Sequence, residues 1–370
     1  MTPINLYGSP MSLYTGRARS YLIKAGLAYR EVPTTSAHFR ETVLPKAGGR
    51  RSLPTVELPD GTVIRDGVAI VDHFEAESGH AFSPASPNQR IVSRLFDAIG
   101  AEGLLRPAMY YRWNFPEQRD FLHFHFETIF PPGGTPSAEK RMRMIREIVN
   151  PSWGVVPEVI GTIEELYEGL LDRLHAHFGQ FPYLLGGRPC IGDFGMMAPL
   201  YGHLGRDPHP RTLMQTRAWH TFRWVERMNR PEPDIGEFED QSTDYLPGDR
   251  VPDTLIEVLR HLAIDYVPET RGACEFINEW LGENRDMPPG TTAERGVGTA
   301  SFDLVGTRID VLAQPFRFHV LSRVQEEFEA LAEPDRSEVH ALLTACNMVE
   351  LLELKLTRAI GRKNNLEVWL

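Results

Sequence analysis

The sequence has little cysteine and no long apolar run, and both absences narrow the classes of protein to which it can belong. Its three cysteines, Cys190, Cys274 and Cys346, are far apart and in no paired spacing. A disulfide scaffold, a zinc finger and a Cys-x-x-Cys redox centre are therefore excluded. No apolar stretch approaches the ~18 residues that a membrane-spanning helix needs. These features predict a cytoplasmic protein that does not enter a membrane.

Positive charge is also scarce relative to negative charge. The chain has 39 lysines and arginines against 50 aspartates and glutamates, a formal net charge of −11, and no basic block. Nucleic acids and anionic membranes bind clustered cationic side chains, so neither is expected as the main partner. With 370 residues, of which 42% are hydrophobic, the chain is long enough for two to three domains of ~150 residues each.

The first eighty residues carry apolar patterns of the lengths of strands and short helices. Strands are predicted at 4–7, 27–32, 55–58 and 62–65, and helices at 14–25 and from 67 onward. Gly26 is a suitable residue to end the first helix, and Asp66 is placed to cap the second. The order strand, helix, strand, followed by strand, strand, helix, predicts a thioredoxin-like domain.

Several segments together resemble the glutathione S-transferase superfamily. They are LYGSP and RARSYLIKAGLAY, the Leu-Pro pair before a strand-turn-strand, RDGVAIVDHFE and, further on, FPYLLGGRPCIGDFGMMAPLYGHL. The resemblance covers roughly residues 4–230. It implies a thioredoxin-like, glutathione-binding domain at 1–82 and an all-helical domain at 88–230. The expected fold class is therefore α/β plus all-α, with a mixed helical and hairpin extension at 240–370.

The resemblance also implies how glutathione would be held. Pro54 would be a cis-proline that turns the backbone of Leu53 toward a peptide ligand; the alternative is an ordinary trans proline that opens a strand. The family usually has an acid followed by serine at the start of the next helix, where this chain has Asp66 and Gly67. The missing hydroxyl removes ~1–3 kcal/mol of hydrogen bonding to the γ-glutamyl carboxylate. Asp66 is equally suited to being a plain helix cap.

The same resemblance places a hydroxyl where redox relatives carry a thiol. Ser12 matches the cysteine position of the thiol-type members, and Tyr14 falls near that of a bacterial class. Because thiol–disulfide exchange needs a thiolate, a hydroxyl here would instead donate to the glutathione sulfur, which then attacks an electrophilic carbon. Ser12 is the first candidate and Tyr14 the second, ahead of Tyr7, Ser9 and Thr15. The alternative is that these residues are caps and packing aromatics.

In the second domain the resemblance makes Tyr110, Tyr111 and Trp113 candidates for the wall of the acceptor site, with aromatic packing as the alternative. Cys190 and Asp193 stand where a helix-capping box belongs, which gives Asp193 a structural role.

No metal is expected. His123, His125 and Glu127 would share one face only in an extended segment, and the phenylalanines around them indicate packing.

The extension predicts helices at 253–283, 316–332 and 335–357 and a hairpin at 299–313 around Gly306. This extension is too long to be a minor addition to the helical domain and too hydrophobic to be disordered. It could cover the active-site cleft, form an accessory domain or make a subunit interface.

The predicted function is a glutathione S-transferase-like enzyme that uses glutathione as co-substrate on a small apolar electrophile. The alternative is a non-catalytic binding or assembly protein with the same fold. A homodimer is expected by resemblance alone.

Overall fold

A four-stranded mixed sheet forms the amino-terminal part of the computed structural model, which describes residues 3–130 and 137–370. The strands are β1 (Ile4–Tyr7), β2 (Tyr29–Val32), β3 (Thr55–Glu57) and β4 (Val63–Arg65), and the helices are α1 (Leu13–Lys24), α2 (Leu44–Lys46) and α3 (Gly67–Glu77). The strand order is β2-β1-β3-β4, with β2 parallel to β1 and the other neighbours antiparallel. The predicted thioredoxin-like arrangement is confirmed.

A helical region follows the sheet. Its helices are α4 (Pro87–Glu102), α5 (Leu105–Trp113), α6 (Arg119–Glu127), α7 (Ala138–Met144), α8 (Ile160–Phe178), α9 (Ile191–Gly202), α10 (Pro208–Arg217) and α11 (Trp219–Met228). Helix α9 is almost wholly buried and packs against both α1 and α4. The predicted capping box is confirmed, because the Cys190 N–H donates to Asp193 Oδ2 at 2.9 Å. Asp193 also accepts from Trp224 Nε1 at 2.8 Å, which ties α11 to α9.

Helices α4 and α9 cross where both have a glycine. A Cβ atom on Gly100 would lie 2.2 Å from the backbone carbonyl of Gly195, so the two backbones touch and no side chain fits between them. We expect Gly100→Ala to reduce the free energy of unfolding by about 1–3 kcal/mol, because the helices must move apart. Gly161→Ala in α8 is the matched control, since nothing lies within 4 Å of its Cβ position. Urea unfolding of both variants checks this, and equal effects would contradict it.

Helix α6 settles how the histidines of this region are arranged. Residues Arg119–Glu127 are helical, so the extended segment that would have aligned His123, His125 and Glu127 does not occur. In the described parts of the chain, no helix is both long and apolar enough to cross a membrane.

The carboxy-terminal extension is ordered and mixed. It contains α12 (Asp253–Glu283), the hairpin β5 (Thr299–Leu304) and β6 (Thr307–Leu312), α13 (Pro315–Glu329), α14 (Asp335–Ala345) and the hairpin β7 (Ile360–Lys363) and β8 (Leu366–Trp369). The predicted long helix and the hairpin around Gly306 are confirmed. The helix predicted over 335–357 ends early, because Asn347 has a φ of 57° and the N–H groups of Asn347 and Met348 bond back to the last turn. The final hairpin was not predicted.

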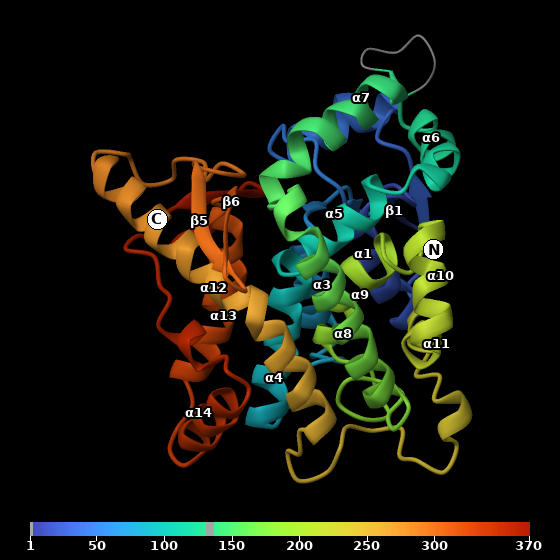
Figure 1. Ribbon diagram of the computed structural model, residues 1–370. Helices are drawn as coiled ribbons and strands as arrows, with labels where there is room; N and C mark the ends of the chain where they lie inside the picture. Colours follow the sequence, from blue (N-terminus) through green and yellow to red (C-terminus); the bar gives the residue numbers. More distant parts are fainter. Residues whose placement is uncertain (1–2, 131–136) are drawn as a thin grey trace.

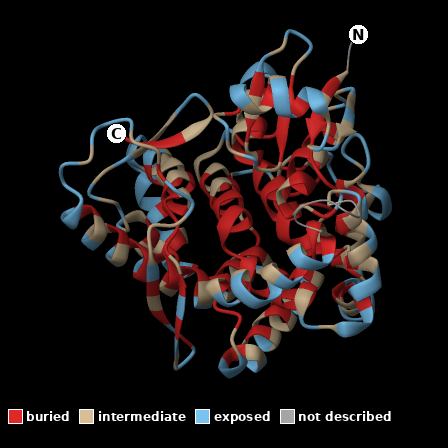
Figure 2. Cartoon of the chain, turned by 90° about the horizontal axis from the view of Figure 1, so that it is seen from above, coloured by how far each residue is buried: buried red, intermediate tan, exposed pale blue. Residues whose placement is uncertain are grey.

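The extension packs on the rest of the molecule along one side (Figure 1). Helix α12 lies along α8, and both α13 and α14 lie on α4. The shared interior is continuous with the helical core, and the buried residues in Figure 2 run from the sheet side through the helices to the extension. Ion pairs cross the same contact, because Arg323 of α13 binds Asp72 of α3 and lies 3.3 Å from Asp97 of α4.

Candidate functional site

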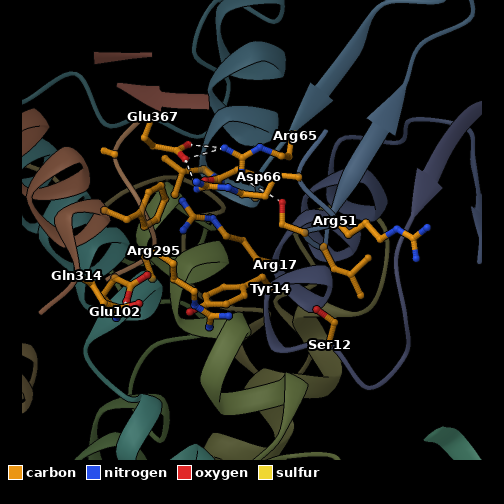
Figure 3. Close-up of a pocket in the computed structure, with 18 of the residues that line it drawn as sticks. Ser12, Tyr14, Arg17, Arg51, Arg65, Asp66, Glu102, Arg295, Gln314 and Glu367 are labelled. Atoms are coloured by element: carbon orange, nitrogen blue, oxygen red, sulfur yellow. Dashed lines mark hydrogen bonds and ion pairs between the residues drawn. The ribbon is translucent and has the colours of Figure 1, made fainter. Parts of the chain in front are cut away.

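A cavity of about 320 Å³ lies where the amino-terminal domain, α4 and the extension meet (Figure 3). Ser12, Tyr14, Leu53, Asp66 and Gly67, all predicted from the sequence, line it. The start of α1, the loop before β3 and the start of α3 are thus brought to one place, as the thioredoxin-like topology requires. The extension supplies the remaining wall.

The two candidate hydroxyls differ in their surroundings. Ser12 is the N-cap of α1, and its Oγ accepts from the Thr15 N–H at 3.2 Å, which leaves its own proton free to donate. The Tyr14 hydroxyl makes no hydrogen bond to any residue that the structure describes. Burial raises the pKa of Tyr14 well above its ordinary value, and the charge of Glu102 adds to this effect. Both groups are therefore protonated donors at neutral pH.

The peptide bond between Leu53 and Pro54 is cis, as the resemblance implied. Asp66 caps α3 by accepting from the Val68 N–H, so the capping role is confirmed, while the first turn of α3 still opens into the cavity. Gly67 lies close to two neighbouring residues. A Cβ atom at this position would lie 3.3 Å from Arg17 Cδ and 3.4 Å from the Tyr14 carbonyl oxygen. A side chain at this position would press on Arg17, which would have to shift by a few tenths of an ångström.

The extension completes the cavity with residues that the sequence analysis did not single out. They are Ala293, Glu294, Arg295, Gln314, Phe316 and Glu367. Glu367 lies on β8, and both of its carboxylate oxygens accept from Arg65 Nη2 at 2.7 Å. The segment that carries Arg295 is held beside β8, because the Ala293 N–H donates to the Glu367 carbonyl at 2.8 Å. The extension thus forms one wall of this cavity, and its expected roles as an accessory domain or a subunit interface stay predictions.

A signal for the final hairpin was present in the sequence. Asn364 and Asn365 form its two-residue turn, both with positive φ, and asparagine is among the residues that such turns favour. The turn docks on the sheet, since Asn365 Nδ2 donates to the carbonyls of Val63 and Lys46 at 2.9 and 3.0 Å.

Comparison with protein families decides the identity of the amino-terminal domain. Residues 6–82 match the family model described as glutathione S-transferase, N-terminal domain. These residues belong to the glutathione S-transferase family. The match includes every cavity residue that the amino-terminal domain contributes. A search of curated proteins finds no match.

Solved structures that are similar to this chain share less than 20% sequence identity with it. The β-etherase LigF from Sphingobium sp. strain SYK-6 is 19% identical, with a TM-score of 0.43, over 65% of this chain and 100% of that one. A theta-class glutathione S-transferase from Xanthomonas axonopodis pv. citri, solved with glutathione bound, is 19% identical, with a TM-score of 0.38, over 61% of this chain and 92% of that one. At this level of sequence identity and TM-score, the substrates and mechanisms of these two proteins cannot be transferred to this chain.

The predicted acceptor residues do not line the cavity of the glutathione S-transferase domain. Tyr110 and Tyr111 are buried in the helical core, where the Tyr110 hydroxyl donates to Glu164 at 2.5 Å and Tyr111 stacks on Phe115. Trp113 packs edge-on against Phe126. For these three, the packing alternative describes the observed contacts.

The lesser hydroxyl candidates are engaged elsewhere. Tyr7 packs on the far side of the sheet, where its hydroxyl donates to Glu57 at 2.9 Å. Ser9 and Thr15 are buried, and their oxygens accept from neighbouring backbone N–H groups. Neither the side chain of Tyr7 nor that of Ser9 lines the cavity.

Both arginines and carboxylates line the cavity; the residues are Arg17, Arg50, Arg51, Arg65, Arg295, Asp66, Glu102, Glu294 and Glu367. Arg17 is buried and paired with Asp97. Arg50 lies 3.2 Å from Glu294, whereas Arg295 forms no ion pair with a described residue and lies over the Trp153 ring. Arg295 is therefore available to a carboxylate of a ligand without the loss of an ion pair among the described residues.

Proposed function

We propose that the protein is a glutathione transferase that joins the sulfur of glutathione to a small apolar electrophile. The observation that supports this is the meeting of three features in one cavity: the cis Leu53–Pro54 bond, the open first turn of α3 and the Ser12 and Tyr14 hydroxyls. The Leu53 backbone would bind the peptide as an added strand does, and the α3 N-terminus would receive a carboxylate.

Ser12 is proposed to act on the sulfur. A hydroxyl donor at the start of α1, next to the positive end of the helix, stabilises a thiolate relative to a thiol. The thiolate then attacks the electrophilic carbon. Arg50 and Arg295 flank the cavity and would neutralise the carboxylates of the tripeptide.

A non-catalytic binding protein is the second candidate. Gly67 favours it, because the hydroxyl that the family places there is absent. Binding of glutathione without turnover of any electrophile would select this candidate.

A homodimer also stays a prediction. A second copy of the chain could not bind to the faces of α3 and α4 that α13 covers.

Glutathione binding tests the proposal directly. The purified protein should be retained on immobilised glutathione, and titration calorimetry should give a dissociation constant of several millimolar or tighter. No measurable heat at that concentration would contradict the transferase and leave the non-catalytic binding or assembly protein.

Ser12→Ala should lower kcat/KM at least about tenfold, because the sulfur loses its donor, while Tyr14→Phe should have a smaller effect. Ser137→Ala is the matched control: Ser137 caps α7 in the same way, by accepting from the Lys140 N–H at 3.4 Å, but does not line the cavity. Steady-state rates with chlorodinitrobenzene, together with melting temperatures, separate loss of a cap from loss of a donor. A larger effect of Tyr14→Phe would move the role to Tyr14.

A further inference from the structure

The β5–β6 hairpin of the extension leaves one edge of strand β6 open. Among the described residues, β6 pairs with β5 and with no other strand. The Ala313 N–H donates to the Gly298 carbonyl at 2.9 Å, and this bond makes the neighbouring last pair of the ladder a non-hydrogen-bonded pair. It follows that the N–H and C=O groups of Arg308, Asp310 and Leu312 point away from β5. They make no hydrogen bond to a residue in the described parts of the chain.

Packing occupies one face of β6 and leaves the other face exposed. Ile309 and Val311 are buried, and a Cβ atom on Gly154 would lie 3.0 Å from Ile309 Cδ1 and 3.2 Å from Val311 Cγ1. Arg308 and Asp310 are exposed on the opposite face. Figure 1 shows the hairpin on the side of the molecule that the extension forms, with α12 beside β5. A strand of six residues with an open edge and an exposed face can pair with another strand.

The exposed face of the hairpin carries three charged side chains, none of which forms an ion pair with a described residue. Asp303 on β5 accepts from the Gly306 N–H at 2.8 Å, which fixes it in the turn. Asp310 accepts from the Ser301 hydroxyl at 2.5 Å. Arg308 and Asp310 are two residues apart, so their side chains lie on the same face of β6. The open strand therefore presents a positive and a negative charge in succession.

A second copy of the same strand complements this pattern. A two-fold axis at Ile309 would place Arg308 of one copy opposite Asp310 of the other, in antiparallel orientation, and the reverse. The backbone groups of these residues point outward, so each facing pair would exchange two N–H···O bonds. An axis at residue 308 or 310 would instead set Arg308 against Arg308 or Asp310 against Asp310, which is unfavourable. Only the axis at Ile309 unites opposite charges and backbone hydrogen bonds.

We propose that β6 is an interface between two copies of this chain, in which the two hairpins form one four-stranded antiparallel sheet. Helix α13 already covers α3 and α4 through its ion pairs, so the second copy uses the extension instead. A contact along one strand edge buries little surface, and the dimer is weak, with a dissociation constant above about 1 μM. The interface does not depend on the transferase activity.

Charge reversal in the full chain tests the interface by sedimentation equilibrium. We expect Arg308→Asp and Asp310→Arg each to raise the dimer dissociation constant at least about tenfold, because each variant sets like charges opposite one another. An equimolar mixture of the two variants should associate within about threefold of the wild type, since every pair in the mixed dimer is again opposite in charge. Glu279→Arg is the matched control: Glu279 is exposed on α12, outside the hairpin, and its reversal should leave association unchanged.

The outcomes separate clearly. A wild type that stays monomeric up to about 1 mM overturns the proposal. Dimerisation that neither reversal weakens also overturns it, and so does a mixture that associates no better than its two components. Recovery in the mixture excludes misfolding as the cause of the single-variant losses, because two misfolded chains would not regain the interface. No glutathione is used, so failure of the proposed transferase function leaves this result intact.

Discussion

Asp97→Ala should lower the free energy of unfolding by about 3–5 kcal/mol. Asp97 is fully buried in α4 and receives Arg17 from α1 and Arg323 from α13. Removing the carboxylate leaves the buried guanidinium of Arg17 with no compensating charge. The free-energy cost of removing that guanidinium from water is then no longer offset by an ion pair. The variant should also bind glutathione more weakly, because Arg17 lines the cavity.

An exposed carboxylate provides the contrast. Asp172 pairs with Arg217 through two hydrogen bonds of 2.8 and 2.9 Å, but its side chain is 52% exposed. Surface pairs of this kind contribute about 0–1 kcal/mol, so Asp172→Ala should be nearly neutral. Urea unfolding, followed by tryptophan fluorescence and circular dichroism, measures both variants. A loss below about 1 kcal/mol for Asp97→Ala would show that the α1–α4–α13 contact does not depend on this carboxylate.

Local patterns were enough to predict the elements that build the site. The succession of strands and helices along the amino-terminal domain, the capping box at Cys190 and the 31-residue helix α12 all follow from signals within a few turns of chain. Ser12, Leu53 and Asp66 were found because a family resemblance attaches roles to such local positions.

Long-range contacts set the limit of the sequence analysis. Glu102 meets Gln314 across 212 residues of chain, and Arg65 meets Glu367 across 302. No periodicity or spacing encodes such a meeting, because it depends on how α13 and the last hairpin pack. Arg17 shows the same limit, because its partner Asp97 lies 80 residues further along the chain, on α4. Tyr110 and Tyr111 were predicted to line the acceptor site from their position in the sequence. In the structure both side chains pack in the helical core instead.

The ion pair between Glu367 and Arg65 should likewise hold the extension in place, and its loss should lower the free energy of unfolding by several kcal/mol. The side chains of both residues are 5% exposed, and Arg362 adds a second pair to Glu367 at 2.9 Å. Glu367→Ala removes the only carboxylate within hydrogen-bond distance of Arg65 among the described residues. We expect a loss of about 3–5 kcal/mol, together with weaker glutathione binding, because the final hairpin would detach from β4 and open the cavity.

The pH dependence of this contact has a definite sign. Burial alone would raise the pKa of Glu367, but the charges of Arg65 and Arg362 outweigh it and lower the pKa below its ordinary value. A carboxyl group with a lowered pKa stabilises the folded state above its unfolded-state pKa of about 4.3. That stabilisation is lost as the pH falls from there through the folded-state pKa. Glu367→Gln should therefore lose stability at neutral pH and show a shallower decline of stability below about pH 4.3 than the wild type.

Glu294→Ala is the matched control at the same rim of the cavity. Glu294 also pairs with an arginine, Arg50, at 3.2 Å, but its side chain is 70% exposed, so its removal should change stability by less than about 1 kcal/mol. Melting temperature and glutathione titration measure the three proteins side by side. If Glu367→Ala retained wild-type stability and glutathione affinity, the hairpin would be an accessory on the surface; the predicted losses in that variant alone would make it a structural wall of the site.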